Sequence, residues 1–315
     1  MSRTRVVFCG TPRFAVPSLK HLLEQKNFEI VGVFTQPDRP RGRGQEISYS
    51  PVKEIALAEK IPVFQPVKVR APEVEQQLRE LTPEMIVIIA YGQIIPGRLL
   101  GIPKHGWINL HASLLPKYRG AAPINWAIVN GETRTGLTTM RIDAGMDTGE
   151  MLLQEELAIG EDDTAPELAG RMAEAGAPLM LKTLRGLVAA TVTGRAQNHA
   201  EATLAPPLKR EDGRIGWARS AEEIYNRMRG FAPWPGAYTQ FRGQTCHVWG
   251  KPVSNEKAEL APGTIFARGA TVCVVCGAGS LLELGNVKLE GRKEVRATEF
   301  ANGARLQAGE RFGKQ

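Results

Sequence analysis

The first half of the chain alternates short apolar runs with stretches of helical spacing. RVVFCG (5–10), EIVGVFT (29–35) and MIVIIAYG (85–92) are apolar on both faces, and Leu19 and Leu22 follow the first run at helical spacing. Such runs predict buried strands, because a strand that is covered on both sides has no polar face. Strands that alternate with helices predict a parallel sheet with helices on each side, the α/β class.

Further elements follow from capping residues and from spacing. Ser50 precedes Pro51, and this pair predicts a helix start because serine caps a helix and proline tolerates its first position. A long helical stretch ends at Val188, and we expect Asp163 to cap its start. The other predicted elements are a helix over 50–60, a strand over 62–66, a helix over 71–80, and two strands over 136–143 and 149–159 around a tight turn.

The pattern changes after residue 189. Residues 190–208 lack periodicity and are rich in Ala, Thr and Pro, which predicts an extended linker. Ser220 and Glu223 then form a capping-box pattern for a helix that has Ile224 and Met228 on one face. Short apolar runs separated by glycine turns follow, and their spacing predicts a small β-barrel. We therefore expect a first domain over 1–189, a linker over 190–208 and a second domain over 209–315.

The distribution of charge along the chain predicts a binding partner. The 315 residues are 43% hydrophobic, which is enough for two domains with separate cores. The net charge is +7, but residues 1–189 carry 22 Lys and Arg against 21 Asp and Glu, whereas residues 209–315 carry 17 against 11. A basic second half predicts contact with a polyanion such as RNA; ordinary charge scatter is the alternative.

The cysteines and the apolar runs exclude several classes of protein. Four cysteines are too few for a disulfide scaffold in a chain of this length. Cys273 and Cys276 form a C-x-x-C inside an apolar run, without a second cysteine pair or a histidine cluster nearby to complete a zinc site, so we expect no metal. No apolar run fits a signal peptide or a membrane span. We expect a cytoplasmic monomer that does not bind membranes.

Polar or small residues follow the predicted strands of the first domain. Gly10, Gln36, Tyr91 and His111 all lie at the carboxyl ends of such strands, where ligands bind to parallel sheets. The three-glycine fingerprint of dinucleotide sites is absent after the first strand, and no acidic residue closes the second. We therefore do not expect a dinucleotide site, but we expect a ligand site at this edge.

Three features converge on that edge. Asn109 and His111 are two residues apart on a predicted strand and would face the same way. Asp143 and Asp147 flank a glycine-containing loop between two strands, and AYGQIIP (90–96) runs from a strand into a loop. An amide can donate to an oxygen that gains negative charge, and a carboxylate beside an imidazole stabilises its cationic form. The pattern fits group transfer through a tetrahedral intermediate; a hydrogen-bonded strand end and a turn-forming Asp are the structural alternatives.

A family resemblance distinguishes these alternatives. NLHASLLPKYRGAAPINWAI (109–128) and DAGMDTG (143–149) resemble the signature of the folate-dependent formyltransferases. Over nearly the whole chain, further motifs are similar to the branch of that family that acts on methionyl-tRNA: FTQPDRPRGRGQ, SPVK, PVFQP, AYGQIIP and RGFAPWPGAY. The resemblance implies a Rossmann-like catalytic domain and an OB-like C-terminal β-barrel. It also implies transfer of the formyl group of 10-formyltetrahydrofolate to the α-amino group of methionine on initiator methionyl-tRNA.

The resemblance also implies roles for individual residues. Asn109 and His111 would hydrogen-bond the formyl oxygen as it becomes an oxyanion. Asp147 would position His111 and help to relay the proton of the attacking amine. The expected folate-binding residues are Ser113, Leu114, Leu115 and Pro116 from the SLLP segment, with Ile89, Ala90, Tyr91 and Gly92 lining the pterin pocket.

An arginine-rich stretch is the expected contact with RNA. Arg39, Arg41 and Arg43 alternate with Pro and Gly between a strand and a helix, a composition that cannot pack a core but can contact phosphates; a solvated surface loop is the alternative. The resemblance implies that this loop enters the acceptor stem of the tRNA and that the basic barrel grips its backbone. The chain departs from the family pattern at Pro207, where Lys209 would stand in, and at Gly216, where the family has Asp.

Two other functions stay open from the sequence. The chemistry would also suit a formyltransferase that acts on a nucleotide or amino-sugar amine, but the arginine-rich stretch and the basic second domain disfavour a small substrate. The other alternative is an RNA-binding protein on an inactive enzyme scaffold, and the presence of Asn109, His111 and Asp147 argues against it.

Overall fold

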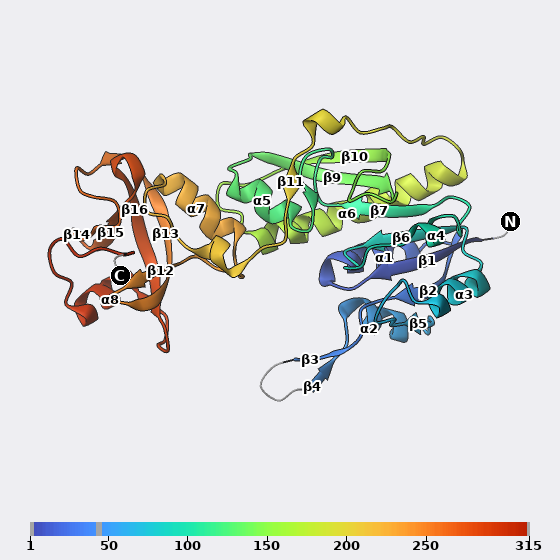
Figure 1. Ribbon diagram of the computed structural model, residues 1–315, viewed down its shortest axis with the longest axis horizontal. Coiled ribbons are helices and arrows are strands. Elements are labelled where there is room, and N and C mark those ends of the chain that lie inside the picture. Colours follow the sequence, from blue (N-terminus) through green and yellow to red (C-terminus); the bar gives the residue numbers. More distant parts are fainter. Residues whose placement is uncertain (1–2, 42–45, 314–315) are drawn as a thin grey trace. The chain divides into compact units, whose positions relative to one another are not determined.

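The computed structural model describes residues 3–41 and 46–313, except for the side chains of residues 40, 41, 46 and 47 (Figure 1). The chain divides into two compact units. Unit 1 consists of Met1–Pro123, Arg134–Ala158 and Leu168–Pro206, and unit 2 consists of Ile124–Thr133, Ile159–Glu167 and Pro207–Gln315.

Unit 1 is built on a seven-stranded sheet with the order β10-β9-β7-β6-β1-β2-β5. The five strands from β7 to β5 are parallel, whereas β9 runs antiparallel to β7 and β10 antiparallel to β9. The predicted Rossmann-like parallel sheet is therefore confirmed, with a hairpin added at one edge. The strands are β1 (Thr4–Gly10), β2 (Phe28–Phe34), β5 (Val63–Phe64), β6 (Met85–Ile89), β7 (Trp107–His111), β9 (Arg134–Arg141) and β10 (Met151–Ala158).

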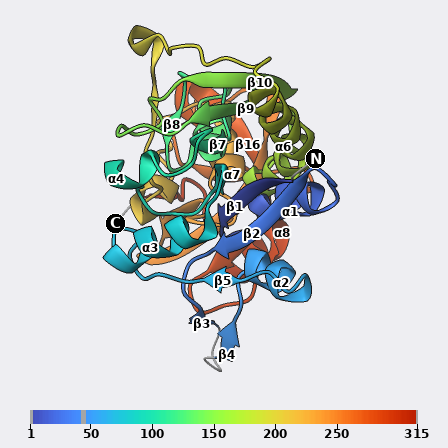
Figure 2. The same cartoon turned by 90° about the vertical axis from the view of Figure 1, so that its right-hand side faces the viewer.

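Helices cover both faces of this sheet. Figure 2 shows α1, α2 and α6 on one face, and α3 and α4 on the other. Gly176 lets α6 approach β7, because a Cβ there would lie 2.5 Å from a methyl carbon of Leu110. Since side chains alternate along a strand, Asn109 and His111 leave β7 on the face opposite α6. The helices are α1 (Val16–Leu23), α2 (Pro51–Ala58), α3 (Pro72–Leu81), α4 (Gly97–Leu100) and α6 (Ala165–Val188), with a 3-10 turn η1 at Arg13–Ala15.

The helix signals in the sequence are confirmed with one correction. Ser50 caps α2, since its hydroxyl accepts a hydrogen bond from the backbone N–H of Lys53. Asp163 does not cap α6: its carboxylate accepts from the N–H of Gly160 in the preceding turn. Thr164, the residue directly before α6, donates instead to Glu167, as in one half of a capping box. Two adjacent cap-forming residues made this helix start ambiguous by one position.

The arginine-rich stretch, expected as a loop, contains a short hairpin. Strand β3 (Arg39–Arg41) pairs antiparallel with β4 (Glu46–Ser48). The hairpin extends away from the sheet of unit 1 in both views (Figures 1 and 2). Its root is held by the carboxylate of Asp38, which pairs with Lys53 and accepts 2.9 Å from the amide of Gln65.

Residues 190–208, predicted as an extended linker, are extended but attached to unit 1 up to Pro206. Strand β11 (Leu204–Ala205) pairs in parallel with β8 (Arg119–Gly120). A 3-10 turn, η2 (His199–Glu201), precedes β11, and Gln197 is almost fully buried. The segment therefore forms its hydrogen bonds with unit 1. Its lack of sequence periodicity could not indicate these contacts.

Unit 2 contains the predicted small β-barrel. Its antiparallel sheet has the order β12-β13-β16-β15-β14, and β17 pairs with β16. Helix α7 begins with the predicted capping box of Ser220 and Glu223 and buries Ile224 and Met228. The elements of this unit are α5 (Pro123–Val129), η3 (Arg210–Gly213), α7 (Ala221–Gly230), β12 (Tyr238–Phe241), β13 (Gln244–Lys257), β14 (Ile265–Arg268), β15 (Thr271–Val275), η4 (Gly277–Gly279), β16 (Ser280–Leu289), β17 (Val295–Arg296) and α8 (Ala297–Ala304).

The barrel is closed by a short segment near the C-terminal end of the described chain. Its backbone bonds on one side to β14 and to Gly263, two residues before that strand: the N–H of Ile265 donates to Glu310, and the N–H of Phe312 donates to Gly263. On the other side the N–H of Gly313 donates to Gln240 of β12. Residues 310–313 thus bridge the two edge strands of the sheet, which removes both open edges.

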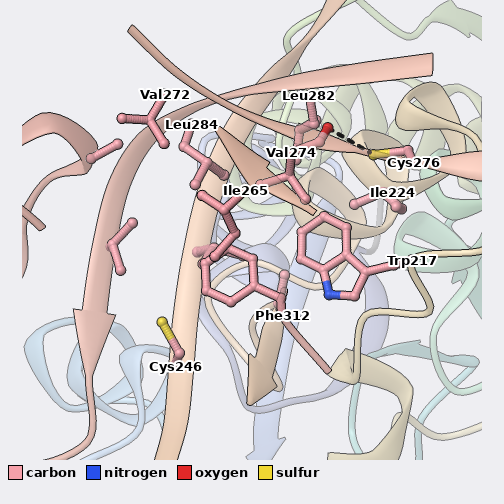
Figure 3. Close-up of a cluster of buried hydrophobic side chains, with 14 of the residues drawn as sticks. Trp217, Ile224, Cys246, Ile265, Val272, Val274, Cys276, Leu282, Leu284 and Phe312 are labelled. Atoms are coloured by element: carbon pink, nitrogen blue, oxygen red, sulfur yellow. Dashed lines mark hydrogen bonds between the residues drawn. The ribbon is translucent and has the colours of Figure 1, made fainter. Parts of the chain in front are cut away.

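Apolar side chains fill the barrel (Figure 3). Trp217 stacks on Phe312 with ring centroids 5.5 Å apart, so the closing segment contributes to the core as well as to the backbone ladder. All four cysteines of the chain are free and buried. Burial raises the pKa of the Cys276 thiol to about 12, and in Figure 3 this thiol hydrogen-bonds to a backbone carbonyl rather than to a second sulfur.

Candidate active site

Strand β7 brings Asn109 and His111 to the carboxyl edge of the sheet. Both side chains leave the strand on the same face, and His111 is almost fully buried while Asn109 is half-buried. Among the residues that the structure describes, none hydrogen-bonds to the carboxamide of Asn109. An amide at a strand end without an internal partner is available to a ligand.

The ring of His111 is oriented by a backbone carbonyl. Its Nε2 lies 2.9 Å from the carbonyl oxygen of Tyr118. Since a carbonyl only accepts, Nε2 carries a proton, and a neutral ring has its lone pair on Nδ1. Nδ1 lies 3.7 Å from Oδ2 of Asp147. The carbonyl of Tyr118 thus contacts one ring nitrogen of His111, and the carboxylate of Asp147 faces the other.

Asp147 is itself held by a backbone N–H. Its Oδ2 accepts 2.8 Å from the N–H of Gly120 in β8. Asp147 has a φ of +53°, in the left-handed region that costs free energy for a residue with a side chain. Its other oxygen, Oδ1, has no hydrogen-bond partner in the described chain and is open to a proton donor.

The second carboxylate of the loop has a structural role. Asp143 accepts from the hydroxyl of Thr148 at 2.8 Å and from the N–H of Gly145 at 3.0 Å. These bonds close the loop between β9 and β10 on itself. Of the two aspartates that the sequence singled out, Asp147 faces His111 and Asp143 shapes the loop.

The SLLP segment is fixed to the antiparallel hairpin. The hydroxyl of Thr138 in β9 donates 2.7 Å to the carbonyl of Ser113 and accepts 3.1 Å from the N–H of Leu115. Gln154 of β10 donates 2.9 Å to the carbonyl of Leu115. Ser113 is fully buried, and its hydroxyl donates to the carbonyl of Lys117, whereas Leu114 and Pro116 are half-buried.

The end of β6 lies beside this strand end. Ile88 pairs with Asn109, so residues 89–92 leave the sheet next to the two polar side chains of β7. Ile89 is fully buried, while Ala90 and Gly92 are exposed and have positive φ values of 47° and 83°. Backbone amides in such a turn are accessible to a polar heterocycle.

Tyr91 connects this turn to the segment that follows β2, two strands away in the sheet. Its carbonyl accepts 2.9 Å from the amide of Gln36, so two of the residues predicted at the strand ends are joined. Its hydroxyl is buried without a partner in the described chain. Burial, with a smaller effect of Cys9, raises the pKa of this hydroxyl above its ordinary range.

The residues predicted to bind tRNA are exposed where the structure describes them. Arg39 lies on β3 of unit 1, and Lys209 lies in unit 2 just before η3, where its N–H donates 2.7 Å to Asp212. The side chain of Arg41 and the whole of Arg43 lie outside the described residues.

The described residues show neither a metal cluster nor a membrane-spanning helix. They contain no group of three or more His, Cys, Asp or Glu side chains that could hold a metal ion. No helix among them is long and apolar enough to span a membrane.

Comparisons with known proteins connect this geometry to a reaction. Residues 3–184 match the family model described as formyl transferase, and residues 207–305 match the model of the formyl transferase C-terminal domain. A protein of Solibacter usitatus (strain Ellin6076) named methionyl-tRNA formyltransferase is 53% identical over 98% of this chain and 99% of its own length. A protein of the same name from Koribacter versatilis (strain Ellin345) is 50% identical over 98% of both chains.

The chain belongs to the methionyl-tRNA formyltransferase family.

The predicted family and enzyme class are thereby confirmed. A solved formyltransferase with a different substrate shares the fold: WlaRD, a sugar 3N-formyl transferase solved with dTDP and 5-N-formyl-THF. It aligns with a TM-score of 0.66 over 93% of this chain and all of its own, at 20% identity. At that identity the likeness concerns the architecture alone.

In this formyltransferase, the sequence predicted side chains that the structure brings to one sheet edge, but it did not predict their backbone partners. Asn109, His111 and Asp147 meet at one edge, and residues 89–92 and 113–116 surround them. The carbonyl of Tyr118 and the N–H of Gly120 were missed. A sequence does not show which backbone groups form hydrogen bonds. The KYRG stretch (117–120) follows the SLLP segment directly, and this position could have indicated that its backbone lies at the site.

Proposed function

We propose that the protein transfers the formyl group of 10-formyltetrahydrofolate to the α-amino group of methionine on initiator methionyl-tRNA, which gives N-formylmethionyl-tRNA. One observation carries the proposal: an unpartnered amide, an oriented imidazole and a carboxylate converge at one sheet edge. The relatives at about 50% identity carry the name of this activity, and a distant neighbour of the same fold was solved with a formylated folate.

Asn109 and His111 would stabilise the oxyanion. When the amine nitrogen attacks the formyl carbon, the formyl oxygen gains negative charge, and the N–H of Asn109 can donate to it. His111 has its Nε2 proton engaged by Tyr118, so it can donate only through Nδ1 and only in its charged form. The carboxylate of Asp147, 3.7 Å away, balances that charge.

Asp147 would also relay a proton. Formation of the new C–N bond leaves the attacking amine with a proton to lose, and Oδ1 of Asp147 is open to accept it. Collapse of the tetrahedral intermediate breaks the bond between the formyl carbon and N10 of the donor. The same proton then goes to N10, which balances the step and releases tetrahydrofolate. This route needs no covalent enzyme adduct and no metal.

Folate would bind along two segments. Residues 113–116 offer a backbone that is held rigid by Thr138 and Gln154, and residues 89–92 offer exposed amides beside Asn109. We assign the pterin ring to residues 89–92, because a planar heterocycle with several donors and acceptors suits backbone groups that are fixed in place.

The tRNA would bind through the hairpin and the second domain. We propose a catalytic domain over 1–189, a linker over 190–208 and a tRNA-binding barrel over 209–315, whose excess of six positive charges suits a polyanion. Arg39, Arg41 and Arg43 of the arginine-rich stretch would contact the acceptor stem, and Lys209 the tRNA backbone. We also propose that the enzyme acts as a monomer in the cytoplasm, where its charged tRNA is found.

Labelled formyl donor tests the whole assignment. Transfer is measured to methionyl-initiator tRNA, to free methionine and to glycinamide ribonucleotide, each at low and at moderate salt. The proposal expects fast transfer to the charged tRNA alone, with a rate that falls as salt rises. Salt-insensitive transfer to a small amine would contradict the tRNA assignment and keep the chemistry.

A further inference from the structure

A buried amide connects the loop of Asp147 to the segment after α6. Nε2 of Gln197 donates 2.8 Å to the carbonyl of Asp147 and 2.8 Å to the carbonyl of Gly149. Its Oε1 accepts from the guanidinium of Arg119, at 3.0 Å from Nε and 2.6 Å from Nη2. Both side chains are only 6% exposed.

The orientation of this amide is fixed by its partners. A guanidinium only donates and a carbonyl only accepts, so the oxygen of Gln197 must face Arg119 and its nitrogen must face the loop. The charge of Arg119 polarises the amide and strengthens the two bonds to the carbonyls. Among the described residues no carboxylate pairs with Arg119, whose further partner is Nδ1 of His199 at 3.1 Å. Among the described residues, Arg119 therefore acts on the Gln197 amide and not as the partner of an acidic side chain.

The bonds from Gln197 act where the backbone is strained. Asp147 has a φ of +53°, and such a conformation persists only when its surroundings determine it. Gln197 holds the carbonyl of the strained residue itself. Without these two bonds the loop could relax toward an ordinary φ, and the carboxylate would move away from His111.

The same segment also holds the partners of the catalytic pair. Thr203 accepts from the backbone N–H of Tyr118 with its hydroxyl, at 2.8 Å, and from the N–H of Arg119 with its carbonyl, at 2.9 Å. Gly120, whose N–H holds Asp147, pairs with Ala205. Residues 197–205 therefore contact both sides of the site: the Asp147 loop through Gln197, and the 118–120 turn through Thr203 and Ala205.

We infer that Gln197, polarised by Arg119, is a positioning residue that holds Asp147 at its distance from His111, so that the segment between the two domains completes the catalytic site. The inference rests on the proposed function, because it assigns to Gln197 the placement of a group that this function uses. Gln197 would contact neither substrate, and it would act only through the Asp147 loop.

The test is a set of variants assayed for kcat and for KM with both substrates. We expect Gln197→Ala to lower kcat about 30-fold and to leave both KM values within about threefold, since displacement of a catalytic group by about 1 Å can cost about 100-fold. Gln197→Glu keeps the shape and the pair with Arg119 but turns a carboxylate oxygen toward two carbonyls. It should lose kcat equally while it unfolds at the wild-type temperature, which separates positioning from failure to fold.

A control and a double variant make the outcome decisive. Asn198→Ala removes a neighbouring amide that bonds only within its own turn, and it should keep wild-type kcat. Gln197→Ala combined with Asp147→Asn should be no slower than Asp147→Asn alone, because both changes remove one function. Losses that multiply, or a rise in KM in place of the fall in kcat, would overturn the inference. Full activity of Asp147→Asn would overturn the proposed function with it, whereas wild-type kcat in Gln197→Ala would overturn the inference alone.

Discussion

Tyr118 and Asp147 lie on the two sides of His111: the Tyr118 carbonyl accepts from Nε2 at 2.9 Å, and the Asp147 carboxylate is 3.7 Å from Nδ1. The carbonyl therefore determines which nitrogen is free to act, and the carboxylate determines what charge that nitrogen can carry. Removal of the carboxylate should therefore affect the reaction while the orientation of the His111 ring is kept.

Asp147→Asn should lower kcat about 100-fold or more, because the amide can neither balance a charged His111 nor accept the proton of the amine. The stability of the fold should change little, since the amide oxygen can still accept from the N–H of Gly120. Single-turnover transfer to methionyl-tRNA at saturating donor measures the effect. A variant that binds tRNA more weakly in proportion to its loss of rate would contradict the role of Asp147.

Asn109→Ala should lower kcat about 100-fold, equivalent to about 3 kcal/mol, which is typical of one lost oxyanion donor. Its melting temperature should stay that of the wild type, because the carboxamide has no hydrogen-bond partner in the described chain. Kinetics and thermal unfolding on the same preparation check both. Lower stability with retained activity would show that Asn109 is a structural strand end.

Gly120→Ala should impair both the fold and the rate. Gly120 has a φ of +118°, and a Cβ there would lie 2.7 Å from the carbonyl oxygen of Ala205. The clash would separate β8 from β11 and move the N–H that holds Asp147, so we expect a loss of about 1–3 kcal/mol in stability and a fall in kcat. Gly97→Ala is the matched control, since a Cβ at Gly97 meets no atom within 4 Å. Equal behaviour of the two variants would remove the basis for this prediction.

Arg41→Ala should raise the KM for methionyl-tRNA several-fold and leave the affinity for folate unchanged. The loss of one phosphate contact should also reduce the slope of log KM against log salt by about one. Arg79→Ala serves as control, because Arg79 is bonded to Glu75 on the surface of α3. An equal loss of folate affinity in Arg41→Ala would contradict the assignment of the hairpin to tRNA.

Asp38→Asn should make the free energy of unfolding depend less on pH in the acidic range. The hydrogen bond from Lys53 holds the pKa of Asp38 below its ordinary range, so this carboxylate stabilises the fold above the unfolded pKa of about 4. We expect the variant to lose about 1 kcal/mol at pH 7, and this difference should vanish as pH falls through the folded pKa. Urea unfolding between pH 7 and pH 3 measures it. A difference that stays constant with pH would exclude a role for the charge.

The sequence predicted the helices, the strands and the proposed site side chains better than the residues that hold those side chains in place. Ser50 and Ser220 marked helix starts that the structure has, since capping is local and depends on residue type. Asn109, His111 and Asp147 could be predicted as site residues because strand periodicity and the family motifs concern side chains. Gln197 and Arg119 were not found, since their bond joins residues 78 positions apart and one of them lies in a segment without periodicity.

The closing segment of the barrel was missed for a related reason. Residues 310–313 bond to strands that are distant in the sequence, and no alternation marks them as a strand. Only Phe312, stacked on Trp217, had a signal in its apolar side chain. Where pairing partners are far apart and the segment is short, tertiary context decides the structure.

The closure of the barrel by residues 310–313 has a consequence for synthesis on the ribosome. Unit 1 draws on no residue beyond Pro206, and its last segment is the one that contacts Asp147. Unit 2 cannot seal its edges until Glu310 and the residues after it have left the exit tunnel. The residues that hold His111 and Asp147 are therefore synthesised about a hundred residues before the segment that closes the barrel, so the proposed catalytic part of the chain is made before the proposed tRNA-binding part is complete.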